Sequence, residues 1–207
     1  MPLEKGAHRK VFESVVQNET RPVSKNDCSQ YTMSVVEKCR QAVPQNTPAP
    51  TMGRITGDWF EWTIAKCLEI AFGRSSYQTS EDIGGKTRNI PGFEKGFVRW
   101  LPCPDIILKT KNDFMVVVSA KWGLRPDRRF AEPYIAMKIK TVKPSVKYLI
   151  LTNTSSSPNT QVLMEAPEID KVYHLRPDLF GGKLLGLSNF PTLIDDLSAI
   201  IGVKSNL

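Results

Sequence analysis

The sequence predicts an α/β fold in which a mixed central β-sheet is flanked by helices. Residues 57–73 carry apolar side chains at helical spacing, and two short apolar runs, 97–108 and 114–120, follow with a polar stretch between them. Helical and strand-like patterns then alternate to the end of the chain. Elements that each bury one apolar face stack in layers around a shared core, which here gives a sheet with helices packed on it.

The first fifty residues are predicted to form an N-terminal arm. Residues 9–18 and 29–43 have weak amphipathic patterns, and the segment from Gln45 to Met52 contains Pro48 and Pro50 among small polar residues, which is typical of a linker. We therefore expect a helical arm and linker over residues 1–52 and a main domain over residues 53–207.

Each element of the main domain has its own pattern. Gly57 to Gly73 gives the strongest helix signal, with Gly73 as the expected C-cap. The polar, Gly-rich residues 74–96 are expected to form a loop, and the two apolar runs after it an antiparallel hairpin. The remaining expectations are a helix at 133–143, strands at 147–152 and 172–175, and an amphipathic helix at 189–201.

Composition and charge exclude several classes of protein. With 41% apolar and 24% charged residues, the chain suits a globular fold, and no apolar run approaches the ~18 residues that a membrane helix needs. Cys28, Cys39, Cys67 and Cys103 form no CxxC pair, so a zinc site is not expected. We expect a soluble, reduced, cytoplasmic protein that contacts no membrane.

A concentration of positive charge predicts a polyanionic partner. Lys and Arg outnumber Asp and Glu by 28 to 21, and residues 121–147 alone hold eight basic residues against two acidic ones. Such a patch is typical of nucleic-acid binding, although a solvated basic face or an anionic membrane surface would give the same composition. Gly85-Lys86-Thr87 has the form of a phosphate-loop ending, but Ser80 replaces its first glycine and Pro91 interrupts the helix it requires, so no nucleotide cofactor is expected.

An acid and a lysine are predicted to meet at one end of the hairpin. Asp105 follows Pro104 at the start of one apolar run, and Lys121 ends the next. Hydrolysis of a phosphodiester needs carboxylates that hold Mg²⁺, and a lysine can orient the attacking water and offset the developing negative charge. Taken singly, each residue is more often a solvated strand end, and it is their joint spacing that indicates a site.

These residues resemble the PD-(D/E)xK motif of type II restriction endonucleases. Pro104-Asp105 supplies the first part, and Ser119-Ala120-Lys121 the second, with serine in the usual acidic position. With this serine the chain resembles the CCGG-recognising group of these enzymes. In that group the strand reads SxK, and the missing carboxylate comes from a helix further along the chain. The resemblance covers about residues 53 to 152 and implies a restriction-endonuclease-like core with Mg²⁺ as cofactor.

The same resemblance implies further site residues. Between Lys121 and Glu165 the acidic residues are Asp127 and Glu132, so Glu132 is the candidate for the displaced carboxylate. It stands about one helical turn before the family position, and a charge that favours a helix N-terminus is the alternative reading. Metal ligands would then be Asp105, Glu132 and the main chain of Ala120. Glu61, in the sequence Gly57-Asp58-Trp59-Phe60-Glu61, resembles a helix glutamate beside the family's active site, with a solvated helix edge as its alternative.

A short segment after the lysine predicts base recognition. Arg125-Pro126-Asp127-Arg128 resembles the group's RPDR/RSDR motif in spelling and in offset, and Arg129 extends its positive charge. Arg can donate two hydrogen bonds to guanine, and Asp can accept one from cytosine. A lone segment of this kind is usually a turn, which is how we interpret Arg176-Pro177-Asp178.

The sequence therefore predicts a Mg²⁺-dependent endonuclease that cuts double-stranded DNA at a GC-cored palindrome. A palindrome presents two identical half-sites, so a homodimer is expected. The alternatives are a repair or recombination nuclease of the PD-(D/E)xK type, which has no need for base-reading residues, and a non-catalytic DNA-binding protein that keeps the fold, which Ser119 in the acidic position would permit.

Overall fold

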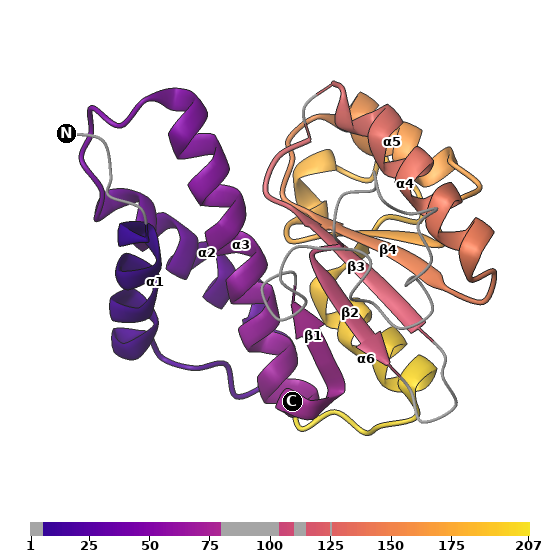
Figure 1. The fold of residues 1–207 in the computed structure, drawn as a ribbon, viewed down its shortest axis with the longest axis horizontal. Coiled ribbons are helices and arrows are strands. Elements are labelled where there is room, and N and C mark those ends of the chain that lie inside the picture. Colours follow the sequence, from indigo (N-terminus) through magenta and orange to yellow (C-terminus); the bar gives the residue numbers. More distant parts are fainter. Residues whose placement is uncertain (1–5, 80–103, 110–114, 125) are drawn as a thin grey trace.

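A six-stranded mixed β-sheet forms the centre of the described structure. The computed structural model describes residues 6–79, 104–109, 115–124 and 126–207. The strands follow one another across the sheet in chain order, with β1 to β3 antiparallel and β3 to β6 parallel (Figure 1). Their bounds are β1 Tyr77–Thr79, β2 Ile106–Lys109, β3 Met115–Lys121, β4 Lys147–Thr152, β5 Lys171–His174 and β6 Ser188–Asn189. The predicted α/β class with a mixed sheet is confirmed.

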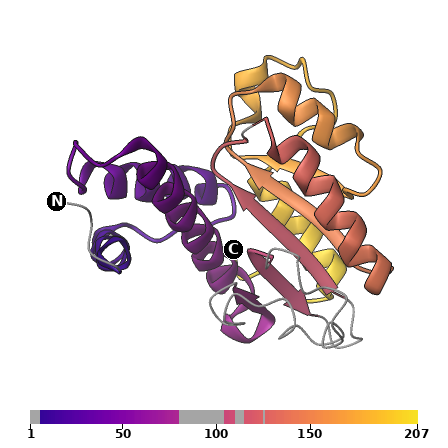
Figure 2. The ribbon, with the colours of Figure 1, turned by 45° about the horizontal axis from the view of Figure 1, so that its top comes forward.

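Helices cover both faces of this sheet. Their bounds are α1 Ala7–Asn18, α2 Asp27–Gln41, α3 Ala49–Phe72, α4 Arg128–Val142, α5 Ser157–Glu165 and α6 Phe190–Ile201, with short 3₁₀ turns at Arg74–Ser76 and Pro177–Phe180. Figure 2 shows α4 and α5 on one face of the strands and α6 on the other, with α1 to α3 beside them. None of the described helices is long and apolar enough to cross a membrane.

The alternation of side chains along β3 divides the core into two. Val116, Val118 and Ala120 face a hydrophobic cluster that α2, α3 and α6 close, whereas Val117 faces a second cluster under α4 and α5. Successive residues of a strand point to opposite faces. Ser119 and Lys121 therefore point to the same face as Val117, toward α4. This direction determines which helix can supply a partner to Lys121.

The N-terminal helices pack directly on α3. The indole N–H of Trp59 donates a hydrogen bond to the main-chain oxygen of His8 at 2.9 Å, and Phe12 and Val35 are buried in the same cluster as Trp59. The predicted linker is shorter than expected, because α3 begins at Ala49 with Pro48 as its N-cap and thus extends across residue 52. Pro50 lies in the first turn of α3, where its missing N–H would have no helical partner in any case.

Helix α4 begins earlier than the pattern from residue 133 predicts. The main-chain oxygen of Asp127 accepts hydrogen bonds from the N–H groups of Phe130 and Ala131, so the first turn closes before Pro133, which lies inside the helix. The consequence for the site is that Glu132 lies within a helical turn facing the sheet and not in the segment before a helix.

Other differences lie outside the predicted helices and strands. Helix α5 is absent from the sequence prediction, although Ser156 caps it by accepting a hydrogen bond from the Asn159 N–H and Pro158 lies in its first turn. β1 begins within the expected loop 74–96. The remainder of that loop with Gly85-Lys86-Thr87, the start of the strand predicted from Phe97, and Cys103 lie outside the described residues.

Candidate active site

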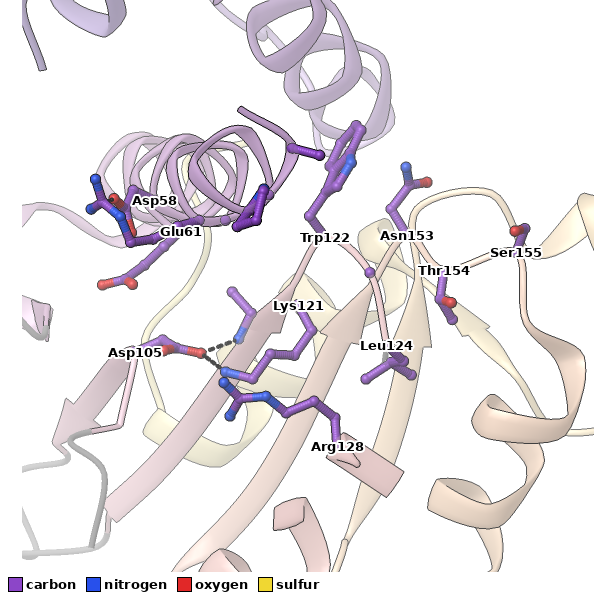
Figure 3. Close-up of a pocket in the computed structure, with 17 residues that line it drawn as sticks. Asp58, Glu61, Asp105, Lys121, Trp122, Leu124, Arg128, Asn153, Thr154 and Ser155 are labelled. Atoms are coloured by element: carbon purple, nitrogen blue, oxygen red, sulfur yellow. Dashed lines mark hydrogen bonds and ion pairs between the residues drawn. The ribbon is translucent and has the colours of Figure 1, made fainter. Parts of the chain in front are cut away.

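Asp105 and Lys121 meet at one end of the β2–β3 hairpin. Asp105 immediately precedes β2, and the antiparallel register pairs Ile106 with Val118, so Asp105 lies beside the last residues of β3. Its Oδ2 atom accepts hydrogen bonds from the main-chain N–H of Ala120 at 2.8 Å and from the Lys121 ammonium group (Figure 3). The structure thus brings together the acid and the lysine, as the strand pattern predicts.

Glu132 reaches the same point from α4. Its side chain is 1% exposed, and its Oε2 atom accepts hydrogen bonds from the hydroxyl groups of Ser119 at 2.9 Å and Tyr148 at 2.8 Å. Its Oε1 atom lies 3.8 Å from Lys121 Nζ and 3.9 Å from Arg128 Nη1, and has no hydrogen-bond partner within the described ranges. The alternative reading of Glu132 as a charge that favours a helix N-terminus does not fit the structure, because Glu132 is buried beyond the first turn of α4.

Burial and nearby charges shift the pKa values of Lys121 and Tyr148. Burial alone would lower the pKa of Lys121, but the carboxylates of Asp105 and Glu132 outweigh it, and the pKa is raised above the ordinary value for lysine. Burial, followed by the negative charge of Glu132, raises the pKa of the Tyr148 phenol well above its usual value. At neutral pH Lys121 is charged and Tyr148 is a hydrogen-bond donor.

A cleft of about 840 Å³ opens beside these residues. One wall is α3, and the opposite side is formed by residues that follow the carboxyl ends of β3 and β4 (Figure 3). Asp105, Lys121 and Arg128 line it. From the end of β4 come Asn153, Thr154 and Ser155. The carboxyl ends of strands are where open α/β sheets commonly bind their ligands.

Glu61 lies on the cleft side of α3, one turn from a second acid that the sequence analysis did not identify. Asp58 also lines the cleft, and its Oδ2 atom lies 3.3 Å from both Arg54 Nη1 and His8 Nε2. Burial raises the pKa of Asp58, and the nearby charges of Arg54 and His8 partly offset this effect. The spacing of three residues from Glu61 on one helix was the signal that could have found Asp58.

The predicted base-reading residues are only partly gathered at the cleft. Arg128 lines it beside Lys121 (Figure 3). Asp127 is exposed at the N-cap position of α4, and Arg129 is half-buried with its guanidinium carbon 4.8 Å from the ring centre of Phe130; neither lines the cleft. Arg125 lies outside the described residues.

The oxygen atoms of this site suit a hard divalent cation. Among the described residues no cluster of three or more Asp, Glu, His or Cys side chains is arranged to hold a metal ion. Mg²⁺, however, needs only one or two carboxylates because it keeps several of its water ligands. Asp105 and Glu132 supply two carboxylates, and the buried Oε1 atom of Glu132 has no donor in the described part of the chain. The residues present therefore fit Mg²⁺.

Solved structures share this fold over most of the chain. Neither a family model nor a curated protein sequence matches the chain. The structure is similar to that of restriction endonuclease PspGI in complex with substrate DNA, with a TM-score of 0.65 and 11% identity over 94% of this chain and 93% of that one. It is also similar to metal-depleted Ecl18kI bound to uncleaved, modified DNA, with a TM-score of 0.60 and 11% identity over 94% and 78% of the two chains.

The structure is also similar to that of the type IIF restriction endonuclease Bse634I with cognate DNA. The TM-score is 0.52 and the identity 15%, over 93% of this chain and 92% of that one. Likeness at this level of identity concerns the backbone and the order of the elements. The chain has the restriction-endonuclease-like α/β fold, with a mixed sheet whose hairpin carries Asp105 and Lys121.

Proposed function

We propose that the protein is a type II restriction endonuclease that hydrolyses double-stranded DNA with Mg²⁺. The observation that carries the proposal is the meeting of Asp105, Lys121 and the buried Glu132 around Ser119, with Oδ2 of Asp105 and Oε2 of Glu132 at 3.3 Å and 2.9 Å from the Ser119 hydroxyl. A carboxylate delivered from α4 to the serine of an SxK strand supports the resemblance to the CCGG-recognising group.

The residues have separable roles in this reaction. Asp105 and Glu132, with the main-chain oxygen of Ala120, would hold Mg²⁺, which would supply an activated water and polarise a phosphoryl oxygen. Lys121 is charged and lies between the two carboxylates, where its ammonium group can orient the water and stabilise the negative charge that develops on the phosphate. Glu61 lies across the cleft, on α3.

Recognition belongs to the segment around the start of α4. Arg125, Asp127 and Arg128, with Arg129 adding charge, would read adjacent C·G pairs, so the preferred site has CC and GG arms, either as CCGG or around a short spacer. The position of Arg128 in the cleft supports a base contact close to the bond that is cut. Two copies of the chain would act on the two strands of the palindrome.

Fragment-end sequencing tests the function directly. The full chain is incubated with phage DNA and Mg²⁺, and the ends of the products are sequenced; we expect discrete fragments that share one GC-cored palindrome. A second incubation with EDTA is the control, because chelation should stop all cutting. Cutting without a shared sequence would favour a repair or recombination nuclease, and specific binding without Mg²⁺-dependent cutting would favour a non-catalytic DNA-binding protein.

A further inference from the structure

The Glu132 carboxylate is held at one oxygen only. Both of its hydroxyl donors come from the central strands: Ser119 on β3, and Tyr148 on β4. The parallel register pairs Val117 with Tyr148, so Ser119 lies two residues further along on the same face of the sheet as Tyr148. Two rigid strands therefore fix the position of the single oxygen Oε2.

The other oxygen is left facing the cations that line the cleft. Oε1 of Glu132 is buried and has no hydrogen-bond partner among the described residues, although Lys121 Nζ and Arg128 Nη1 lie 3.8 Å and 3.9 Å away. Both nitrogen atoms lie beyond hydrogen-bond distance, so this buried oxygen keeps an unfilled acceptor position that a ligand can complete. The side chain cannot turn Oε1 toward the two hydroxyl groups without releasing Oε2 from them.

We propose that Tyr148 and Ser119 are positioning residues that clamp Oε2 of Glu132 and so present Oε1 to the divalent metal ion. This inference rests on the proposed function and deepens it, because it assigns a role to the serine that stands in the acidic position of the motif. Neither Ser119 nor Tyr148 lines the cleft. Their effect passes through the orientation of Glu132, as hydrogen-bond partners of metal ligands commonly act.

Tyr148→Phe is the central variant, and the chain offers a matched control. Tyr173 on β5 makes the same kind of bond, donating its hydroxyl proton to Asp196 Oδ2 at 2.6 Å, and it does not line the cleft. Tyr173→Phe therefore removes an equivalent tyrosine–carboxylate hydrogen bond elsewhere in the sheet. A loss that reflects only general stability would be similar in the two variants.

The first readout is metal binding without catalysis. Mn²⁺ binding to the DNA-free protein is measured by electron paramagnetic resonance of the unbound ion. We expect the dissociation constant to rise roughly tenfold or more in Tyr148→Phe and in Ser119→Ala, the scale found for partners of metal ligands, and to stay at the wild-type value in Tyr173→Phe. Circular dichroism melting shows that each variant is folded.

The second readout separates an effect on metal binding from an effect on the rate of the cleavage step. In Tyr148→Phe the Mg²⁺ concentration that gives half-maximal cleavage should rise by a similar factor, whereas the rate at saturating Mg²⁺ should change much less. If wild-type protein binds Mn²⁺ and cuts DNA while folded Tyr148→Phe and Ser119→Ala bind the ion as tightly as wild type does, the clamp is disproved and the proposed function stands. If wild-type protein binds no divalent ion and cuts no DNA, both proposals fail together.

Discussion

The Lys121 ammonium group donates a hydrogen bond to Oδ2 of Asp105, and both side chains line the cleft. Replacing either residue with alanine should therefore abolish cleavage and leave specific binding largely intact, because metal and water positioning act on the chemical step, whereas affinity comes mainly from phosphate and base contacts. Cleavage is measured with Mg²⁺, and binding by gel shift with Ca²⁺. Wild-type rates in either variant would disprove the active-site assignment.

Glu132→Gln keeps the size and the hydrogen-bonding shape of the side chain but removes its charge. We expect cleavage to slow by about a hundredfold and to need more Mg²⁺, a scale typical of the loss of one stabilising group at a catalytic site. Because Ser119 Oγ lies within hydrogen-bond range of both carboxylates, adding Ser119→Glu to this variant should restore part of the rate. Normal cutting by Glu132→Gln would move the metal ligand to Glu61 or Asp58, the acids on α3.

Arg128 lines the cleft, and its Nη1 atom also lies 3.9 Å from Glu132 Oε1. Arg128→Ala should lose about 1–3 kcal/mol of discrimination at the inner C·G pairs, the value of one bidentate base contact. The measurement is Ca²⁺-supported binding to a cognate duplex and to one altered only at those pairs, so that slower chemistry does not interfere.

Lys138 is the control residue for this experiment. It lies on α4 away from the cleft lining, and Lys138→Ala should weaken binding to all sequences alike and reduce its salt dependence. Lys138 Nζ lies 5.4 Å from the ring centre of Tyr134, and Lys140, the neighbouring candidate, forms an ion pair with Asp170 at 2.6 Å. Full discrimination by Arg128→Ala would mean that this arginine contacts phosphate and reads no base.

At the scale of elements, α3 carries glycine where a helix former would be more stable. Gly57 lies inside the helix and lines the cleft, and a Cβ atom added there would meet nothing within 4 Å. Gly57→Ala should therefore raise the free energy of unfolding by about 1 kcal/mol in urea titrations, since alanine is the better helix former.

The same substitution should weaken DNA binding, because the new side chain projects into the space that the ligand enters. The Gly57→Leu variant should still fold and should bind DNA more weakly than Gly57→Ala does. The loss of DNA binding should thus increase with the size of the side chain. Binding is measured with Ca²⁺ on the duplex found by fragment-end sequencing. A variant that is more stable and binds as tightly as wild type would show that DNA does not approach this face of α3.

At the scale of the whole molecule, a buried histidine links β5 to the cleft. His174 Nε2 lies 2.8 Å from the main-chain oxygen of Thr154, which lines the cleft, and Nδ1 accepts a hydrogen bond from the Arg176 N–H at 2.9 Å. The ring is therefore neutral, with its proton on Nε2. Burial lowers the pKa of His174, and the hydrogen bond from Nε2 to the Thr154 oxygen only partly offsets this effect.

Stability should consequently fall as the pH drops below about 6.5, the ordinary histidine value, because the unfolded chain then binds a proton that the folded ring does not accept until its lower pKa is reached. Urea unfolding between pH 8 and pH 5 measures this loss. His174→Gln should be less stable at pH 8 and show a shallower decline, with His8 unchanged in both proteins as an internal control. Equal slopes would exclude His174 as the source.

The sequence by itself determined most of the local elements and the pairing of Asp105 with Lys121. Hydrophobic spacing over 57–73, 114–120 and 189–201 corresponds to α3, β3 and α6, because an amphipathic segment must turn its apolar side chains toward a core wherever that core lies. Asp105 and Lys121 could be paired because a hairpin is a local structure whose register follows from its two strands.

Only the tertiary structure decided which side chains complete the site. The parallel pairing of β3 with β4 brings the Tyr148 hydroxyl to Glu132, and the packing of α3 against the strand ends brings Asp58 and Gly57 to the cleft. Nothing near Tyr148 in the sequence distinguishes its hydroxyl from an ordinary tyrosine in a buried strand. The reason is physical: contacts between residues far apart in the chain depend on register and helix docking, which many weak interactions set together and no single segment encodes.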